Sequence, residues 1–525
     1  METPREFAER PYQREARLAI EQEFASRDAT IIEMATGLGK TEIFTQLMDR
    51  WGGRCLVAAP LITLVGQAAK KIQSRTGVMP GIEQADLWSD ETPMSRSRFV
   101  VASKDTLISG DPKRYTRIKN IGLVIIDECH LSITSSWKEL ISHFREQGAK
   151  ILGVTATARR HDKRAMSQVY QSCCYQYGIV EATRDGWLVP ARSKTVQLET
   201  LDLKGIGSSR RNVFGNDFSL TELRRRLEDS RTILEISEVT ARETEGMKTV
   251  IYCASVNEAK EVAERLEDAH GINAGWICAD TSRCPETQRR LVLDGFAHGD
   301  ITHVCNVGIL TTGWDFPGLE CIVMARPTRS LSLYTQIFGR GTRPLPGTVD
   351  FDNSTPMTRK KSIANSDKSS FLMIDLVDAS LQHKIRTSVD VMVGTDDEEI
   401  IMRAKQFVAE STEDRVEVEE AVREARAIIK ARRDEEARIQ RAKLDVYAEY
   451  RMVDVDPHGK PTGEVKFPKR GARFVFGRYK GWLVKETPTW YLTSCQNGRP
   501  RISMPWLSKA IDREMDFRNG RQHEG

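Results

Sequence analysis

The sequence predicts an α/β protein with two parallel-sheet domains in tandem, followed by a long helix and a small basic, aromatic-rich C-terminal domain. Short β-branched runs alternate with longer mixed stretches, as a parallel sheet flanked by helices requires. A chain of 525 residues with 40% hydrophobic content can bury several cores. The expected strands form two sets: 29–34, 55–60, 98–103, 122–128 and 150–157, then 249–255, 274–280, 302–310, 321–327 and 371–377.

Changes in composition set the expected domain boundaries. Gly and Pro indicate a connector over 185–194, irregular exposed chain over 205–217 and a surface loop over 347–369. The stretch from Thr412 to Tyr450 lacks Gly and Pro and predicts one long helix. If this helix formed a coiled coil, two successive positions of its apolar seam would carry charged residues. This favours a helical spacer packed on its own protein over a dimer interface. The expected domains are 1–190 (first α/β domain), 191–235 (linker), 236–395 (second α/β domain), 396–455 (helical spacer) and 456–525 (C-terminal domain).

Charge and cysteine content narrow the class of protein. The net charge is +4, but fourteen Lys and Arg face seven Asp and Glu after residue 455, so the basic surplus lies in the tail. The ten cysteines show no CxxC pair, which disfavours a zinc site or a disulfide framework. No apolar run approaches the ~18 residues that span a bilayer, and the N-terminus lacks a signal-peptide core. We therefore expect a cytoplasmic protein without a membrane partner.

The stretch MATGLGKT, residues 34–41, predicts a phosphate-binding loop directly after an expected strand. Glycines let backbone N–H groups face an anion, and the following helix adds its positive end. Lys40 would reach the β and γ phosphates, and Thr41 would give its hydroxyl to Mg²⁺. The strict pattern requires glycine where Met34 stands, so a tight bend without a ligand stays open at this point. The loop residues expected to bind the nucleotide are Thr36, Gly37, Leu38, Gly39, Lys40 and Thr41.

A carboxylate pair follows the apolar run in GLVIIDECH, residues 122–130. Asp127 and Glu128 would lie at the carboxyl edge of the sheet, beside the phosphate loop. Asp127 would hold Mg²⁺, directly or through water, and Glu128 would orient and deprotonate the attacking water. A solvated strand end is the alternative, but the lysine loop upstream makes it improbable.

These two stretches resemble motifs I and II of the superfamily 2 helicases, with DECH as motif II, and further motifs follow in the family's order over roughly residues 10–380. Motif I of that superfamily tolerates residues other than glycine at the position of Met34. The resemblance implies two RecA-like domains, ATP and Mg²⁺ as cofactors, and hydrolysis in the cleft between the domains. The connector 179–193 looks like that of the group containing type III restriction motors, repair helicases and phage recombination helicases.

In the first domain, the resemblance implies that Gln13 reads adenine, with Tyr12 as a candidate stacking neighbour. APLITLVGQ (59–67) is similar to motif Ia and SKDTL (103–107) to motif Ib, which implies nucleic-acid contacts for Thr63 and Ser103. TAT (155–157) is similar to motif III, which couples nucleotide state to the domain interface. A helix-surface amide for Gln13, and strand ends and helix caps for the other motifs, are the alternatives.

In the second domain, GILTTGWDFPG (308–318) resembles motif V and QIFGRGTRP (336–344) resembles motif VI. Arg340 and Arg343 lie three residues apart, so both can point across the cleft at phosphates, which the planar guanidinium binds bidentately. A surface turn is the weaker alternative. The implied residues are Gln336, Arg340 and Arg343 for catalysis, Gly313 and Asp315 for the nucleotide, and Thr281, Thr311 and Thr312 for nucleic acid.

The tail interleaves aromatic with basic residues, a composition that suits single strands or fork junctions. Arg478, Lys480 and Trp482 are its candidate nucleic-acid contacts. The alternative is a small core in which the charges only solvate the surface; its members would be Phe474, Phe476, Trp482 and Trp490.

The expected function is an ATP-dependent DNA helicase or translocase that moves along DNA and unwinds or remodels it. DEAD-box RNA helicases differ at motifs II and III, so single-stranded or forked DNA is the expected partner, with RNA as the alternative. A nuclease or a single-strand-binding protein is a candidate protein partner. Two other functions stay open: a double-strand DNA translocase without strand separation, and a nucleic-acid-binding scaffold with a non-hydrolysing ATP switch.

Overall fold

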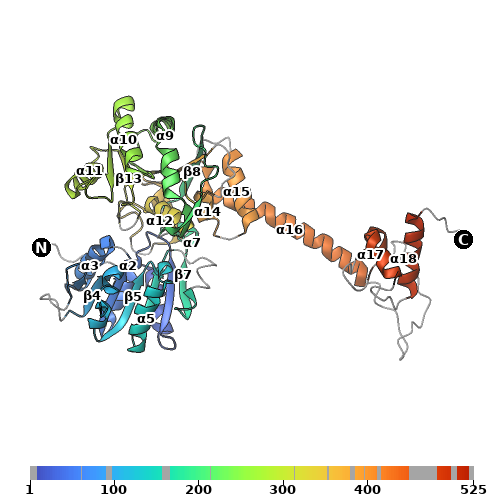
Figure 1. Ribbon diagram of the computed structural model, residues 1–525, viewed down its shortest axis with the longest axis horizontal. Coiled ribbons are helices and arrows are strands. Elements are labelled where there is room, and N and C mark those ends of the chain that lie inside the picture. Colours follow the sequence, from blue (N-terminus) through green and yellow to red (C-terminus); the bar gives the residue numbers. More distant parts are fainter. Residues whose placement is uncertain are drawn as a thin grey trace. The chain divides into compact units, whose positions relative to one another are not determined.

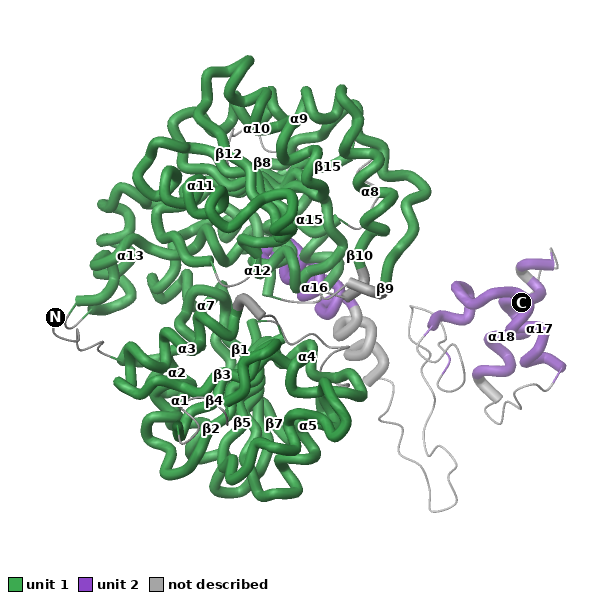
Figure 2. Tube along the Cα trace, turned by 60° about the vertical axis from the view of Figure 1, so that its left-hand side comes forward, with its two compact units in different colours: residues 1–425 green, residues 426–525 purple. Residues whose placement is uncertain are grey.

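The computed structural model divides the chain into two compact units, residues 1–425 and 426–525 (Figure 2). No helix within the described part is long and apolar enough to cross a membrane. The structure describes residues 9–60, 62–89, 97–156, 166–212, 215–311, 314–351, 354–378, 385–394, 397–410, 416–448, 474, 482–497 and 505–519.

The first sheet of unit 1 contains seven parallel strands in the order β3-β4-β2-β5-β6-β1-β7 (Figure 1). Its strands are β1 (Ala29–Met34), β2 (Arg54–Ala59), β3 (Gly81–Glu83), β4 (Phe99–Ser103), β5 (Ile121–Asp127), β6 (Lys150–Thr155) and β7 (Ser172–Tyr177). All five expected strands are confirmed, and the two additional strands, β3 and β7, lie at the edges of the sheet. Neither edge strand has the continuous apolar run of a central parallel strand, so the pattern did not indicate them.

Helices cover both faces of this sheet. On one face, α1 (Pro11–Glu23), α2 (Lys40–Arg50) and α3 (Ile62–Thr76) bury apolar side chains against the strands. On the other face, α5 (Ser135–Glu146) buries Trp137, Leu140 and Phe144. The remaining short helices are α4 (Lys104–Leu107), η1 (Arg114–Arg117), η2 (Cys129–Leu131) and α7 (Ile179–Arg184).

The second sheet also has seven strands, in the order β12-β13-β11-β14-β15-β8-β16, and only β16 is antiparallel to its neighbour. Its strands are β8 (Ala191–Leu198), β11 (Thr249–Tyr252), β12 (Ala274–Cys278), β13 (His303–Val307), β14 (Cys321–Met324), β15 (Phe371–Asp378) and β16 (Val416–Glu417). The five expected strands are again present. Strand β8 falls where the sequence predicts a connector and a linker, yet it pairs with β15 along its whole length.

The helices of the second domain again form two layers. One face carries α8 (Leu220–Leu227), α9 (Ser230–Glu243) and α10 (Val256–His270), and the other carries α11 (Glu286–His298), α12 (Leu331–Gly341) and α14 (Ser388–Met392). Helix α15 (Glu398–Glu410) packs beside α14. Figure 1 shows α12 between the two sheets. A single cluster of buried apolar side chains runs through both domains and includes Trp187 and Leu188 of the connector and Phe338 of α12.

Two stretches expected as irregular chain contain regular structure. The segment 205–217 forms most of a hairpin, β9 (Ser208–Asn212) and β10 (Gly215–Phe218), so this prediction is wrong. The buried Asp217 carboxylate holds the hairpin because it accepts hydrogen bonds from Thr328 and Arg329. The segment 347–369 contains α13 (Pro356–Ala364), which Thr355 begins with a capping box.

The long helix is confirmed as α16 (Val418–Ala448), and it begins later than Thr412. Its first turns bury Val418, Val422 and Ala425 in the core of unit 1, as expected for a spacer packed on its own protein.

The C-terminal unit contains η3 (Val484–Glu486), α17 (Thr489–Gln496) and α18 (Pro505–Arg518). The sequence analysis gave a small aromatic core as the alternative to nucleic-acid binding by the tail. This core is only partly present, because Trp482 is 49% and Trp490 57% exposed. Phe476, Arg478 and Lys480 lie outside the described residues. The observed core consists of Phe474, Val484, Tyr491, Leu492, Cys495, Leu507, Ile511 and Met515.

Candidate functional site: the interface between the two α/β domains

The loop between β1 and α2 has the backbone that a phosphate cradle needs. Gly37 and Gly39 adopt left-handed φ values of 93° and 76°, which glycine reaches without strain. Gly39 is also the N-cap of α2, so the positive end of that helix faces the loop. The Lys40 Nζ donates to the Met34 carbonyl at 3.1 Å, and burial lowers the pKa of Lys40. The lysine is therefore held at the loop and is poorly solvated.

The predicted carboxylate pair lies at the carboxyl end of β5, close enough to Lys40 to interact electrostatically with it. Burial raises the pKa of both Asp127 and Glu128, and Lys40 opposes the shift. Glu128 has a left-handed backbone with a φ of 49°, a strained conformation that is found at functional sites. Asp127 Oδ1 accepts a hydrogen bond from the Glu128 amide at 3.0 Å.

Helix α12 brings motif VI against the phosphate loop. A Cβ atom on Gly339 would lie 2.5 Å from the Thr36 Cβ atom, so only glycine allows this approach. A Cβ atom on Gly37 would lie 3.3 Å from the Arg343 Cγ atom. The arginine side chain therefore lies directly over the loop, and the alternative of a surface turn for residues 339–343 is wrong.

The two arginines of motif VI are held differently. Arg343 forms an ion pair with Asp315 of motif V, and its buried Nε has no hydrogen-bond partner among the described residues. Arg340 is 8% exposed and donates from Nε and Nη2 to the Thr311 carbonyl, at 3.2 and 2.8 Å. Arg343 therefore already faces the first domain, whereas Arg340 is bound to the backbone of its own domain.

A histidine that the sequence analysis did not select connects three motifs. His130 of the DECH stretch shares a hydrogen bond with Thr155 of motif III at 3.0 Å through Nδ1, and another with Ser332 of α12 at 3.2 Å through Nε2. The only sequence signal was its position in motif II. This contact gives motif III the interface position that the resemblance implied.

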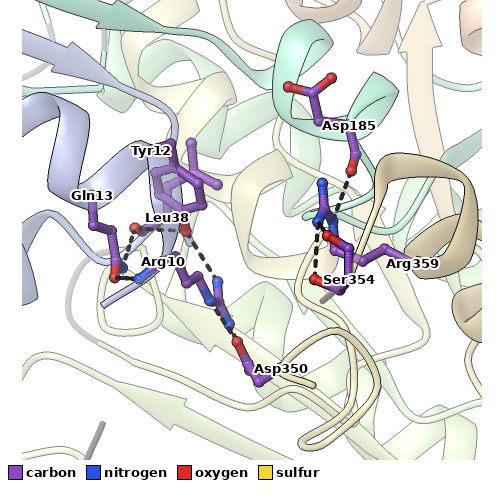
Figure 3. Close-up of polar contacts among 8 residues, drawn as sticks. All are labelled: Arg10, Tyr12, Gln13, Leu38, Asp185, Asp350, Ser354 and Arg359. Carbon is purple, nitrogen blue, oxygen red and sulfur yellow. Dashed lines mark hydrogen bonds and ion pairs between the residues drawn. The ribbon is translucent and has the colours of Figure 1, made fainter. Parts of the chain in front are cut away.

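Figure 3 shows the predicted adenine end of the site, where Tyr12 and Gln13 contact Leu38 of the phosphate loop. The Gln13 Nε2 donates to the Leu38 carbonyl at 3.2 Å, its Oε1 accepts from the Arg10 amide at 3.1 Å, and the side chain is buried, so it is not a helix-surface amide. The Tyr12 hydroxyl donates to the same carbonyl, and its ring stacks on Tyr177. Both side chains of the predicted base-reading pair thus contact the loop.

Two arginines connect the segment after motif VI, residues 350–359, with the first domain through hydrogen bonds (Figure 3). Arg10 donates from Nε and Nη2 to the two carboxylate oxygens of Asp350, at 2.7 and 2.8 Å. Arg359 of α13 donates to the Asp185 carbonyl at 2.9 Å, and its guanidinium lies 3.8 Å from the Trp187 ring centre. The sequence analysis missed these contacts because it treated residues 347–369 as a surface loop.

The predicted nucleic-acid residues do not gather in one place that the structure can show. Ser103 is buried and caps α4 by accepting a hydrogen bond from the Thr106 amide, so the helix-cap alternative describes its side chain. Thr311 is buried, and Thr281 is exposed after β12. Other predicted residues lie outside what the structure describes. These are Thr312, Gly313, Arg478, Lys480 and the side chain of Thr63.

The residues present fit a nucleotide and Mg²⁺. Three residues of the candidate motifs have a buried polar atom without a hydrogen-bond partner in the described structure: Glu128 Oε2, Gln336 Oε1 and Arg343 Nε. The Thr41 hydroxyl and the Asp127 carboxylate are hard oxygen donors of the kind that Mg²⁺ binds together with phosphates. The described residues hold no cluster of three His, Cys, Asp or Glu that could hold a metal by themselves.

Gly339→Ala is expected to reduce ATP hydrolysis strongly, by about 10²-fold, because a methyl group would push motif VI away from Thr36, and misplacement by about 1 Å costs this much. Gly52→Ala is the matched control, since a Cβ atom there meets nothing within 4 Å. Steady-state kcat and thermal unfolding of both variants provide the measurement. Wild-type turnover in Gly339→Ala would contradict the close approach.

Two protein families match consecutive parts of the chain. Residues 6–160 match the family described as "Type III restriction enzyme, res subunit", and residues 230–344 match "Helicase conserved C-terminal domain". The first match contains the phosphate loop and the carboxylate pair, and the second contains motifs V and VI. The two matches therefore include both sides of the interface.

Named proteins match the same region at low identity. The Saccharomyces cerevisiae protein named "Putative ATP-dependent helicase IRC3" is 29% identical over 330 residues, which are 59% of this chain and 46% of that protein. The EcoAI type I restriction enzyme endonuclease subunit of Escherichia coli is 24% identical over 349 residues, 60% of this chain and 42% of that subunit. Less than half of the length of either relative is matched.

A solved structure supports the fold. The ATP-dependent type ISP restriction-modification enzyme LlaBIII bound to DNA superposes with a TM-score of 0.50 and 14% identity, over 76% of this chain and 29% of that one. Both sheets, the interface motifs and the two family matches lead to the same assignment. The chain contains a type III restriction enzyme res-subunit domain and a helicase conserved C-terminal domain, and it is similar to superfamily 2 helicases and to restriction-enzyme subunits.

Proposed function

We propose that this protein is an ATP-dependent DNA helicase or translocase that hydrolyses ATP at the interface between its two RecA-like domains. The observation that carries the proposal is the position of Arg343, which extends from the second domain and lies against Gly37 of the phosphate loop in the first. An arginine in this place can stabilise the charge that develops on the transferred phosphoryl group, which a switch without turnover does not need.

The chain's own residues divide the chemistry among them. Lys40 and the loop amides would bind the β and γ phosphates, and Gln13 and Tyr12 would recognise the base. Glu128, whose Oε2 has no hydrogen-bond partner in the described structure and lies 3.4 Å from His130 Nδ1, would orient the attacking water and take its proton. Mg²⁺, held by Thr41 and Asp127, would neutralise charge on the phosphates. Desolvation strengthens each of these electrostatic contacts.

Hydrolysis would be coupled to movement because both domains contact the same phosphates. ATP joins the loop of the first domain to the arginines of the second, and loss of the γ phosphate removes that link. The His130–Ser332 contact lies on the same interface and gives motif II a direct connection to α12. DNA bound across both domains would then be gripped at two alternating spacings, mainly through phosphates and independently of sequence.

DNA is favoured over RNA by the relatives. The EcoAI subunit belongs to a restriction enzyme, and the LlaBIII structure was solved with DNA. We also propose that the C-terminal unit binds DNA, because Trp482 and Trp490 expose aromatic surface in a basic part of the chain.

A nucleic-acid-stimulated ATPase panel tests the proposal. Forked, single-stranded and duplex DNA are each compared with RNA of the same sequence. We expect DNA to raise kcat and Lys40→Ala to abolish the stimulated turnover, because the loop then lacks its phosphate cation. Preference for RNA would assign the protein to RNA, and absence of stimulated turnover would leave only the scaffold function. Unwinding of a fork, compared with displacement of a third strand from a triplex, separates a helicase from a double-strand translocase.

A further inference from the structure

A buried lysine outside the predicted motifs connects two of them. Lys368 lies between α13 and β15 and is 2% exposed. Its Nζ donates to the carbonyl oxygen of Pro317 at 2.7 Å and to that of Arg343 at 2.8 Å. Pro317 belongs to motif V, two residues after Asp315, and Arg343 is the last arginine of motif VI. One side chain therefore joins the backbones of both motifs.

Burying the Lys368 ammonium group costs free energy, and hydrogen-bond acceptors must offset the loss of water. Removing an amine from water disfavours its charged form, and the pKa of Lys368 falls to about 7. Arg343 lowers that pKa further, whereas Glu320 and Asp315 raise it. A buried donor must be satisfied by acceptors, and here two backbone carbonyls serve that purpose. An apolar side chain of the same length could fill the space but could not hold the two carbonyls together.

The two carbonyls belong to the segments that form the Arg343–Asp315 ion pair. The Arg343 guanidinium pairs with Asp315 and its side chain lies over Gly37. Lys368 fixes the backbone of Arg343 directly and that of Asp315 through Pro317. The Arg343 Nε has no hydrogen-bond partner within the described structure.

We propose that Lys368 is a positioning residue for ATP hydrolysis, which fixes motifs V and VI so that the Arg343 guanidinium meets the nucleotide phosphates. The proposal rests on the function proposed above. Lys368 does not touch the nucleotide itself, and its effect on turnover passes through Arg343.

Lys368→Met tests the proposal because methionine has a similar length and no donor. We expect kcat for DNA-stimulated ATP hydrolysis to fall about 10²-fold, the usual cost of a misplacement of about 1 Å, with a smaller change in KM for ATP. Lys405→Met is the matched control. Its Nζ donates to the Ile385 carbonyl at 3.1 Å and to the buried Asp390 carboxylate at 2.6 Å in the same domain. We expect it to lower the unfolding temperature but to leave kcat unchanged.

A double-mutant cycle separates positioning from general destabilisation. In the Arg343→Ala background, Lys368→Met is expected to cause little further loss of kcat, because the group that it positions is already absent. Additive losses, or wild-type kcat in Lys368→Met alone, would overturn the proposal. If the methionine variant does not fold, Lys368→Gln is used in the same cycle.

A crystal structure of the Lys368 variant distinguishes failure of this inference from failure of the proposed function. We expect the Arg343–Asp315 ion pair and the contact with Gly37 to be lost. If they persist, Lys368 does not position Arg343. If they are lost but the wild-type protein hydrolyses no ATP under any condition, the positioning role stands and the proposed function is wrong.

Discussion

Arg343→Ala is expected to lower kcat for DNA-stimulated ATP hydrolysis about 10³- to 10⁵-fold, the contribution of a phosphate-binding arginine in related nucleotide hydrolases. The side chain lies over Gly37, and its Nε has no hydrogen-bond partner in the described structure, so its loss removes a guanidinium placed at the phosphate loop. Steady-state rates at saturating ATP and DNA provide the measurement. ATP affinity should change less than kcat, because the interaction strengthens in the transition state.

The control for this arginine is Arg242→Ala, which removes a 63% exposed side chain paired with Glu243 on α9. It should leave kcat unchanged. A loss of less than about 10-fold in Arg343→Ala would show that Arg343 does not act on the transferred phosphate. The catalytic role would then pass to Arg340, after release from the Thr311 carbonyl.

Glu128→Gln is the second variant with a large expected effect, a fall in kcat of about 10²- to 10⁴-fold with nucleotide binding retained. Glutamine keeps the shape of the side chain but cannot accept the proton of the attacking water. Burial raises the pKa of Glu128, so the substitution removes an unfavourable buried charge, and the unfolding temperature should not fall. Stimulated ATPase rates, nucleotide titration and thermal unfolding measure the three quantities.

Glu139→Gln is the matched control for the general base. Glu139 of α5 accepts hydrogen bonds from Lys113 and Tyr115. It belongs to none of the motifs of the candidate site. Its activity should equal that of the wild type. Near-normal hydrolysis in Glu128→Gln, with nucleotide bound, would reject the role of Glu128.

The sequence predicted the parts of the fold that depend on local pattern. Central parallel strands are continuous apolar runs, so all ten expected strands appear. Strand β8 was missed because its sequence, ARSKTVQL, contains no continuous apolar run, although it pairs with β15 along its whole length. The hairpin before α8 was missed because its order depends on the Asp217 contacts with residues more than a hundred positions away. Local propensity contains no information about such partners.

In the candidate site too, sequence motifs predicted some residues, and only three-dimensional contacts revealed the others. Gln13, Lys40, Glu128 and Arg343 were selected by motif order, and the structure brings them to one interface, although their roles stay predictions. His130 and Lys368 were not selected, because their importance lies in contacts with Ser332, Pro317 and Arg343 that sequence spacing does not reveal. A lysine in a polar loop is usually solvated, and only its burial shows otherwise.

The apolar cluster that runs through both domains has a thermodynamic consequence. Any separation of the two domains during the ATPase cycle would hydrate some of Trp187, Leu188 and Phe338. Hydration of nonpolar groups raises the heat capacity, so the enthalpy of opening must change with temperature. Plots of ln kcat against reciprocal temperature should therefore curve if opening limits the cycle, and should be straight if bond cleavage does.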